Sequence, residues 1–293
     1  MSETAQEIAT QPACWEVAAG TAAAASPYLP RPGERVAVIG CGTSWFMAQA
    51  YAGLREAARG GVTDAWAASE FPAGRAYDRV VAITRSGTTT ELVRLLSELE
   101  EGPETVAICA VPGTPVPGAT RHAVFLEFAD ETSVVQTRFA TSVLALLRAH
   151  LGEDLTTAIA DAERAVADPL PISDLAVFDH FVFLGHGWTV GLANEAALKM
   201  REAAQAHTES YPAMEYRHGP VSLAGPSSLV WILATPDPAV AADIRATGAT
   251  VIEATMDPMA ELVRAQRVAV ALAEARGLDP DHPRHLTRSV VLS

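Results

Sequence analysis

Short apolar runs alternate with longer amphipathic segments through the first half of the chain. The runs "RVAVIGCG" (residues 35–42), "RVVAITRSG" (79–87) and "TVAICAV" (105–111) have the length and continuous apolar character of buried β-strands. Residues 44–60 and 88–102 follow the first two runs, carry apolar side chains at helical spacing and end in glycine. Strands and helices joined by such short connections predict parallel βαβ units, and hence an α/β fold with doubly wound sheets.

The same order of features recurs in the second half. Five stretches there resemble stretches of the first half and keep their order, beginning at Phe181, Met200, Glu209, Ser228 and Gly248. Any two βαβ units share some features, but agreement in order and spacing favours a duplication. We therefore expect two tandem subdomains, residues 34–170 and 171–293, each a flavodoxin-like parallel sheet flanked by helices. Residues 1–33 are expected to form an N-terminal helix (3–18) followed by a linker.

Composition limits what this fold can do. The chain has 293 residues, of which 49% are hydrophobic, so it can bury a sizeable core. A net charge of −14 argues against a nucleic-acid partner, although a local site can still bind a small anion. The three cysteines lack CxxC spacing and the histidines lack metal-ligand spacing, so we expect reduced thiols, no metal and no cofactor. No apolar run or leader-like start indicates a membrane partner or export, so we expect a cytoplasmic protein.

Two of the predicted strands end in glycine-containing turns that run into helices. The first turn is "GCGTS" (residues 40–44), and the second holds five hydroxyl side chains around one glycine, at Thr84, Ser86, Thr88, Thr89 and Thr90. The first amide groups of a helix have no intrahelical partner and attract anions. One Ser or Thr is enough to cap a helix, so five hydroxyls predict a phosphate cradle more readily than an over-polar cap.

The phosphate is expected to belong to a small molecule. The first turn lacks the third glycine of GxGxxG, and no GxxxxGK[ST] motif occurs, so the sequence disfavours dinucleotide and nucleotide sites. The equivalent corner of the second half (residues 232–240) keeps Thr235 but has two prolines and Asp237. Only the first subdomain is therefore expected to hold the phosphate.

These stretches, together with residues 194–220 and the terminal "DPDHPRHLTRSVVLS", resemble the sugar isomerase (SIS) family over residues 34–293. More narrowly, they are similar to the isomerase half of glutamine–fructose-6-phosphate amidotransferase and to stand-alone amino-sugar-6-phosphate deaminases. The resemblance implies that phosphate is bound by Thr84, Arg85, Ser86, Thr88 and Thr89. It implies that the sugar is lined by Cys41, Gly42, Thr43, Ser44, Val134, Gln136, Glu195 and Arg288.

The resemblance also implies catalytic groups. Glu202 matches the family's proton-transferring carboxylate, and Lys199 precedes it by three residues, which places both on one helix face. His218 matches the histidine that opens the sugar ring. Because that histidine reaches into the neighbouring subunit's site, the resemblance implies a homodimer.

The implied reaction converts an amino-sugar 6-phosphate, such as glucosamine 6-phosphate, to fructose 6-phosphate and ammonia by proton transfer between C1 and C2. The chain leaves no room for a glutaminase domain, so no glutaminase activity is expected. Arg288 stands where the amidotransferase has lysine, and arginine stays protonated and cannot form a Schiff base. The alternatives are an aldose–ketose 6-phosphate isomerase, a fructosamine-6-phosphate deglycase and a non-catalytic sugar-phosphate-binding regulator.

Overall fold

The computed structural model describes residues 1–72, 74–99 and 102–292, and the chain divides into two compact units. The first unit comprises Ala13–Thr132, Gln136–Leu155 and Thr287–Ser293. The second unit comprises Met1–Pro12, Ser133–Val135 and Thr156–Leu286. This division differs from the expected boundaries at both chain ends, at residues 133–135 and at residues 156–170, where a helix joins the second unit.

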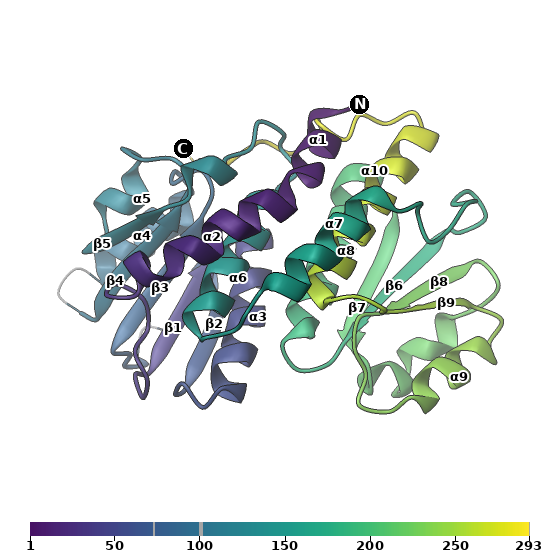
Figure 1. The fold of residues 1–293 in the computed structure, drawn as a ribbon, viewed down its shortest axis with the longest axis horizontal. Helices are drawn as coiled ribbons and strands as arrows, with labels where there is room; N and C mark the ends of the chain where they lie inside the picture. Colours follow the sequence, from purple (N-terminus) through teal and green to yellow (C-terminus); the bar gives the residue numbers. More distant parts are fainter. Residues whose placement is uncertain (73, 100–101, 293) are drawn as a thin grey trace. The chain divides into compact units, whose positions relative to one another are not determined.

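The first unit is built on a five-stranded parallel sheet in the order β2-β1-β3-β4-β5 (Figure 1). This is the flavodoxin-like order, and it confirms the predicted fold class. The strands are β1 (Val36–Gly40), β2 (Thr63–Ala67), β3 (Arg79–Thr84), β4 (Glu104–Cys109) and β5 (His122–Phe125).

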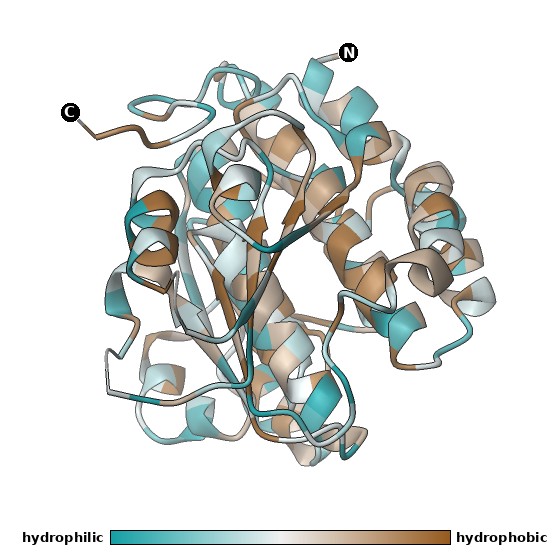
Figure 2. Ribbon diagram, turned by 90° about the vertical axis from the view of Figure 1, so that its left-hand side faces the viewer, coloured by the Kyte–Doolittle hydropathy of each residue, from teal (hydrophilic) through white to brown (hydrophobic). Residues whose placement is uncertain are grey.

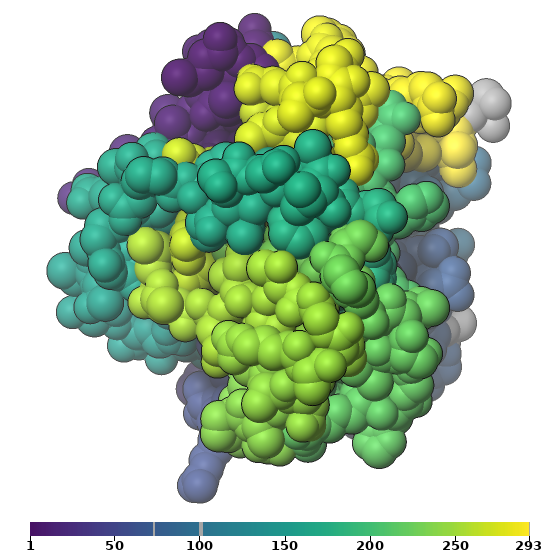
Figure 3. Space-filling model, turned by 90° about the vertical axis from the view of Figure 1, so that its right-hand side faces the viewer, coloured from purple at the N-terminus to yellow at the C-terminus, as the bar shows by residue number. Residues whose placement is uncertain are grey.

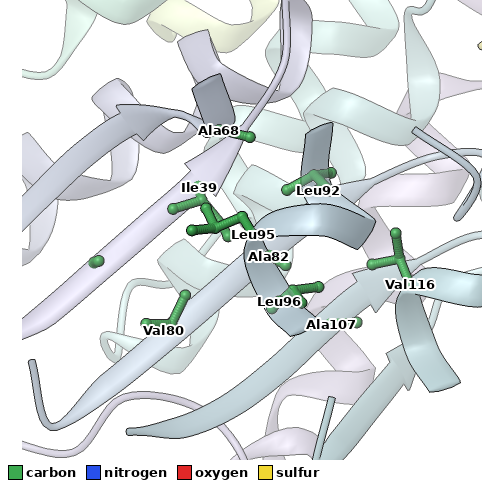
Figure 4. Packing of buried hydrophobic residues seen from close by; sticks show 10 residues of the cluster. Ile39, Ala68, Val80, Ala82, Leu92, Leu95, Leu96, Ala107 and Val116 are labelled. Carbon is green, nitrogen blue, oxygen red and sulfur yellow. The ribbon is translucent and has the colours of Figure 1, made fainter. Parts of the chain in front are cut away.

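The central strands of this sheet are apolar on both faces because helices cover both faces. Helices α4 (Thr90–Glu98) and α5 (Pro115–Gly118) contribute Leu92, Leu95 and Val116 to one core layer, which packs on strand residues that include Ile39 and Ala82 (Figure 4). Helix α3 (Thr43–Ala57) packs on β1 and β2, and α6 (Arg138–His150) packs on α3. The ribbon is correspondingly hydrophobic along the strands (Figure 2).

The second unit repeats this plan with a four-stranded parallel sheet in the order β7-β6-β8-β9. Its order matches that of the first four strands of the first unit, as a duplication predicts. The strands are β6 (His180–Gly185), β7 (His207–Pro212), β8 (Ser228–Ile232) and β9 (Thr250–Glu253). The helices are α7 (Thr156–Ala167), α8 (Thr189–Ala204), α9 (Ala239–Arg245) and α10 (Pro258–Ala275).

The N-terminal segment forms two helices where the sequence predicts one. Helix α1 (Glu3–Ala9) ends at Ala9 with Thr10 as its C-cap residue, and α2 (Gln11–Ala25) begins directly afterwards. Pro12 lies in the first turn of α2, where a missing amide hydrogen costs no helical hydrogen bond. The amide and hydroxyl of Thr4 both donate to Asp281 Oδ1 at 2.7 Å. In Figure 3 the purple N-terminal residues accordingly lie beside the yellow chain that follows α10. These contacts explain why α1 belongs to the second unit.

Candidate functional site

The predicted phosphate corner connects β3 to α4 in the first unit. Thr84, the last residue of β3, accepts a hydrogen bond at its Oγ1 from the Gly87 amide at 3.1 Å. Ser86 Oγ accepts from the amide of Thr88 at 3.3 Å and from its hydroxyl at 3.1 Å. Thr89 occupies the N-cap position of α4 with an extended backbone, and its side chain makes no capping hydrogen bond. The hydroxyls therefore gather at a helix N-terminus, as the sequence predicted.

Gly87 lets the corner approach the next loop of the sheet. Its φ of +69° lies in the left-handed region, and a Cβ atom there would come within 1.8 Å of Thr114 Oγ1 and 3.1 Å of Cys109 Sγ. Thr114 is itself fixed, since its hydroxyl donates to the Val111 carbonyl at 2.8 Å. The backbone of the cradle thus rests directly on the turn that follows β4.

The predicted sugar-binding turn lies at the same sheet edge. It follows β1, which pairs in parallel with β3, so both turns stand at the carboxyl ends of neighbouring strands. The chain continues outward in opposite directions from these two strands, and ligands of doubly wound sheets bind at such a point. Gly42 has a φ of +55° and begins α3, whose first turn buries Thr43 and Ser44. Burial, reinforced by the nearby Glu91 carboxylate, raises the pKa of the Cys41 thiol to about 11.

A buried carboxylate that the sequence analysis missed supports the cradle from the start of α6. Glu131 Oε1 accepts hydrogen bonds from the Thr137 amide at 2.6 Å and from the Arg138 amide at 2.8 Å, so it caps α6. Its other oxygen, Oε2, lies 3.7 Å from Arg85 Nη1. The available signal was weak, because Glu131 lies six positions before Thr137, the N-cap residue of α6. Gln136, predicted to line the sugar, lies half-buried in the same segment, whereas Val134 belongs to the second unit, where its amide donates to the Asp281 carbonyl.

The C-terminal tail lies on the cradle. Arg288, predicted to contact sugar, forms an ion pair with Asp130, and its carbonyl accepts a hydrogen bond from Arg85 Nη2 at 3.0 Å. The next residue, Ser289, places its hydroxyl 3.1 Å from Ser86 Oγ and 2.9 Å from Thr88 Oγ1.

In the second unit, α8 brings Glu195, Lys199 and Glu202 together. Lys199 Nζ lies 3.4 Å from Glu195 Oε1 and forms an ion pair with Glu202. The Lys199 and Glu195 side chains are 1% exposed, whereas Glu202 is 20% exposed. The helix therefore holds a buried charged pair beneath a carboxylate that solvent or a substrate can reach. Such a carboxylate, oriented by a fixed ammonium, is suited to proton transfer.

His218 is exposed and follows the 3-10 turn Glu215–Arg217. Its amide donates to the Glu215 carbonyl at 2.9 Å. The adjacent Arg217 forms ion pairs with Asp237 at 2.7 Å and with Asp243 at 2.5 Å. The hydrogen bond from Arg217 lowers the pKa of Asp237. The His218 imidazole is therefore exposed to solvent, and the ion pairs of Arg217 hold the turn that precedes it.

The described residues contain neither a metal centre nor a membrane span. No group of three or more His, Cys, Asp or Glu side chains among them is placed to hold a metal ion. No helix in this part of the chain is long and apolar enough to cross a membrane. The expectations of no metal and no cofactor stay predictions.

Comparison with known proteins finds enzymes of sugar-phosphate metabolism that are similar to this chain. Residues 31–151 match the SIS domain model. The glutamine–fructose-6-phosphate aminotransferase (isomerizing) of Methanothermobacter thermautotrophicus is 28% identical over 305 residues, which cover 88% of this chain and 52% of that protein. The enzyme of the same description from Gloeobacter violaceus is also 28% identical, with the same coverage. The chain therefore spans about half the length of these curated relatives.

Solved structures share the fold along the whole chain. The glucosamine-6-phosphate deaminase of Thermotoga maritima superposes with a TM-score of 0.82 at 24% identity, and covers 99% of this chain and 100% of that one. The tagatose-6-phosphate ketose/aldose isomerase of Escherichia coli gives a TM-score of 0.83 at 19% identity, with coverage of 100% and 96%. At these identities the likeness concerns the fold.

Proposed function

We propose that this chain is a phosphosugar isomerase that deaminates an amino-sugar 6-phosphate, a proposal supported by the match of residues 31–151 to the SIS domain model. The observation that carries the proposal is the β3–α4 corner, where the hydroxyls of Thr84, Ser86 and Thr88 converge at a helix N-terminus. Hydroxyl and amide donors together with the helix dipole suit a phosphate monoester. The pairing of β1 with β3 puts the Thr43–Ser44 turn at the same sheet edge, which supports the proposal that this turn contacts the sugar.

Glu202 is the base in this proposal. It removes the C2 proton of the open-chain amino sugar and returns a proton to C1, which leaves an imine at C2. Water adds to that imine and ammonia leaves, so glucosamine 6-phosphate and water give fructose 6-phosphate and ammonia. Lys199 orients Glu202, and Glu195 keeps Lys199 in place. These contacts favour an acid–base route, which needs no covalent imine with the protein.

His218 is the group proposed to open the sugar ring, since imidazole exchanges protons near neutral pH. Its exposed position after an anchored turn supports a role toward a second copy of the chain. We therefore propose a homodimer in which each subunit donates His218 to the other's site. Mixing Glu202→Gln with His218→Ala chains tests this directly, because mixed dimers regain one complete site only if the histidine acts across the interface.

A substrate panel tests the proposed function. Purified protein is incubated with glucosamine 6-phosphate, galactosamine 6-phosphate and fructosyl-amino-acid 6-phosphates, and ammonia and keto-sugar phosphate are followed. Glu202→Gln is expected to lower kcat by at least about 100-fold with little change in phosphosugar binding. Glu163→Gln, an exposed glutamate of α7, is the matched control and should be unaffected. Unchanged turnover in Glu202→Gln would refute the base assignment.

The same panel separates the alternatives. Conversion between aldose and ketose phosphates without ammonia identifies a simple isomerase, and release of a free amino acid identifies a deglycase. Tight binding without turnover across the panel identifies a sugar-phosphate-binding regulator.

A further inference from the structure

The hydroxyl cluster at the cradle includes a residue from the far end of the chain. Ser289 Oγ lies within hydrogen-bond distance of Ser86 Oγ and Thr88 Oγ1, which are themselves 3.1 Å apart. The three oxygens form a triangle, and each hydroxyl can turn its single hydrogen outward. Such a triangle can offer one donor to each terminal oxygen of a phosphate monoester.

Backbone contacts hold the tail on both sides of Ser289. The Thr90 amide, in the first turn of α4, donates to the Val290 carbonyl at 3.3 Å. In return, the Leu292 amide donates to Thr90 Oγ1 at 2.9 Å. The tail therefore follows the start of α4, and its path fixes where the Ser289 hydroxyl points.

Arg85 fastens the tail just before Ser289. Its side chain is 3% exposed and reaches away from solvent, with Nη1 toward Glu131 Oε2 and Nη2 donating to the Arg288 carbonyl. Glu131 is fully buried and is itself fixed by the first amides of α6. The guanidinium thus links two parts of the first unit, the start of α6 and the tail, through the cradle loop on which it sits. The planar guanidinium presents several donors in a fixed fork, so it can serve these two acceptors at once.

We propose that Ser289 is a phosphate-binding residue of this site and that Arg85 is the positioning residue that holds it there. This inference rests on the proposed function, because it assumes that the cradle binds a phosphosugar. The inference assigns Arg85 to holding the tail in place. Because Glu131 balances the charge of Arg85, neutral hydroxyl and amide groups make the contacts to phosphate. Residues 290–292, which follow Ser289, are apolar and carry no hydroxyl group.

The first test concerns the tail and needs no ligand. Trypsin cleavage after Arg288 is followed by intact mass in the wild type, in Arg85→Gln and in Arg79→Gln. Arg79 is the matched control because it lies at the other end of β3, is also 3% exposed and is also paired with a carboxylate, Glu34. We expect Arg85→Gln to speed this cleavage by about 10-fold to 100-fold, the range of a lost hydrogen bond to a charged group, and Arg79→Gln to leave it unchanged. Equal rates in all three proteins overturn the role of Arg85.

Arg85→Lys keeps the test valid if Arg85→Gln does not fold. Lysine keeps a positive charge beside Glu131 but cannot match the two-pronged contact of arginine. Its cleavage after Arg288 is expected to be faster than in the wild type. A wild-type rate in the lysine variant overturns the proposal.

The second test measures affinity for inorganic phosphate and fructose 6-phosphate by calorimetry. Ser289→Ala is expected to weaken both about tenfold, whereas Ser97→Ala, on the exposed face of α4, should not change either. If the wild type binds and Ser289→Ala binds equally well, the assignment of Ser289 is overturned while the proposed function stands. If the wild type binds neither compound, the proposed function itself fails.

Discussion

Gly87→Ala is expected to destabilise the loop that forms the proposed phosphate site, because the added methyl group would clash with Thr114. The added methyl group meets Thr114 Oγ1 at 1.8 Å and Thr114 Cβ at 2.8 Å, contacts that no side chain can make. Thr114 cannot simply turn away, since its hydroxyl donates to the Val111 carbonyl at 2.8 Å. The substitution must therefore move the Thr114 side chain or the loop that carries Gly87.

Three effects set the size of the loss. A φ of +69° costs an L-residue about 1–2 kcal/mol. Loss of the hydrogen bond from Thr114 costs about 1 kcal/mol, and overpacking of a tight contact costs about 1–3 kcal/mol. We expect Gly87→Ala to lower the free energy of unfolding by about 3–6 kcal/mol.

Gly113→Ala is the matched control, because Gly113 has a φ of +73° but nothing within 4 Å of the place that a methyl group would take. It should lose only the conformational part, about 1–2 kcal/mol. Urea unfolding followed by fluorescence measures both variants. Gly87→Ala combined with Thr114→Gly should recover most of the difference, since it removes both close contacts. The reasoning is refuted if the two single variants unfold at the same urea concentration.

The half-buried Cys41 thiol and two charged clusters give three more expectations. Because its pKa is raised to about 11, Cys41 should react with iodoacetamide at pH 8 about 100-fold more slowly than a thiol with an ordinary pKa, and rapid labelling found by peptide mass would contradict this. Lys199→Met removes the ammonium that balances the buried Glu195, so urea unfolding should show a loss of about 3–5 kcal/mol, most of it regained when Glu195→Gln is added. The lowered pKa of Asp237 makes its ion pair stabilising above its ordinary pKa of 3.8, and this contribution is lost as pH falls through the lowered value. In Arg217→Gln the carboxyl titration seen by NMR should move up toward 3.8, and an unmoved titration would exclude Arg217 as the cause.

The sequence predicted the central strands well and the outer strands poorly. The run at 79–87 contains β3, and the run at 105–111 overlaps β4, because strands buried on both faces read as continuous apolar stretches. β2, with sequence "TDAWA", and β5, with sequence "HAVF", lie at the sheet edges and are only partly buried. Their mixed polarity gives neither a continuous nor an alternating apolar signal, so they were not predicted.

Site residues close in sequence were easier to predict than those brought together by the fold. Helical spacing placed Lys199 and Glu202 on one face, and the structure joins them by an ion pair. The contact of Ser86 with Ser289 spans 203 positions and depends on the path of the whole tail. No local pattern encodes such a contact, so the sequence alone could not link the tail to the cradle or assign α1 and the tail to different units.

The duplicated fold gives a physical reason why we propose phosphate binding at one corner and not at its counterpart. β8 occupies the position of β3 in its own sheet, and the chain passes from it into α9. At that corner the Asp237 carboxylate accepts a hydrogen bond from the Ala239 amide at 2.9 Å, in the first turn of α9. The protein's own anion therefore takes the place that a phosphate would need, and Arg217 balances its charge. At the β3–α4 corner the residues of the same turn carry hydroxyls, which leave the helix N-terminus able to accept an external anion in a chain of net charge −14.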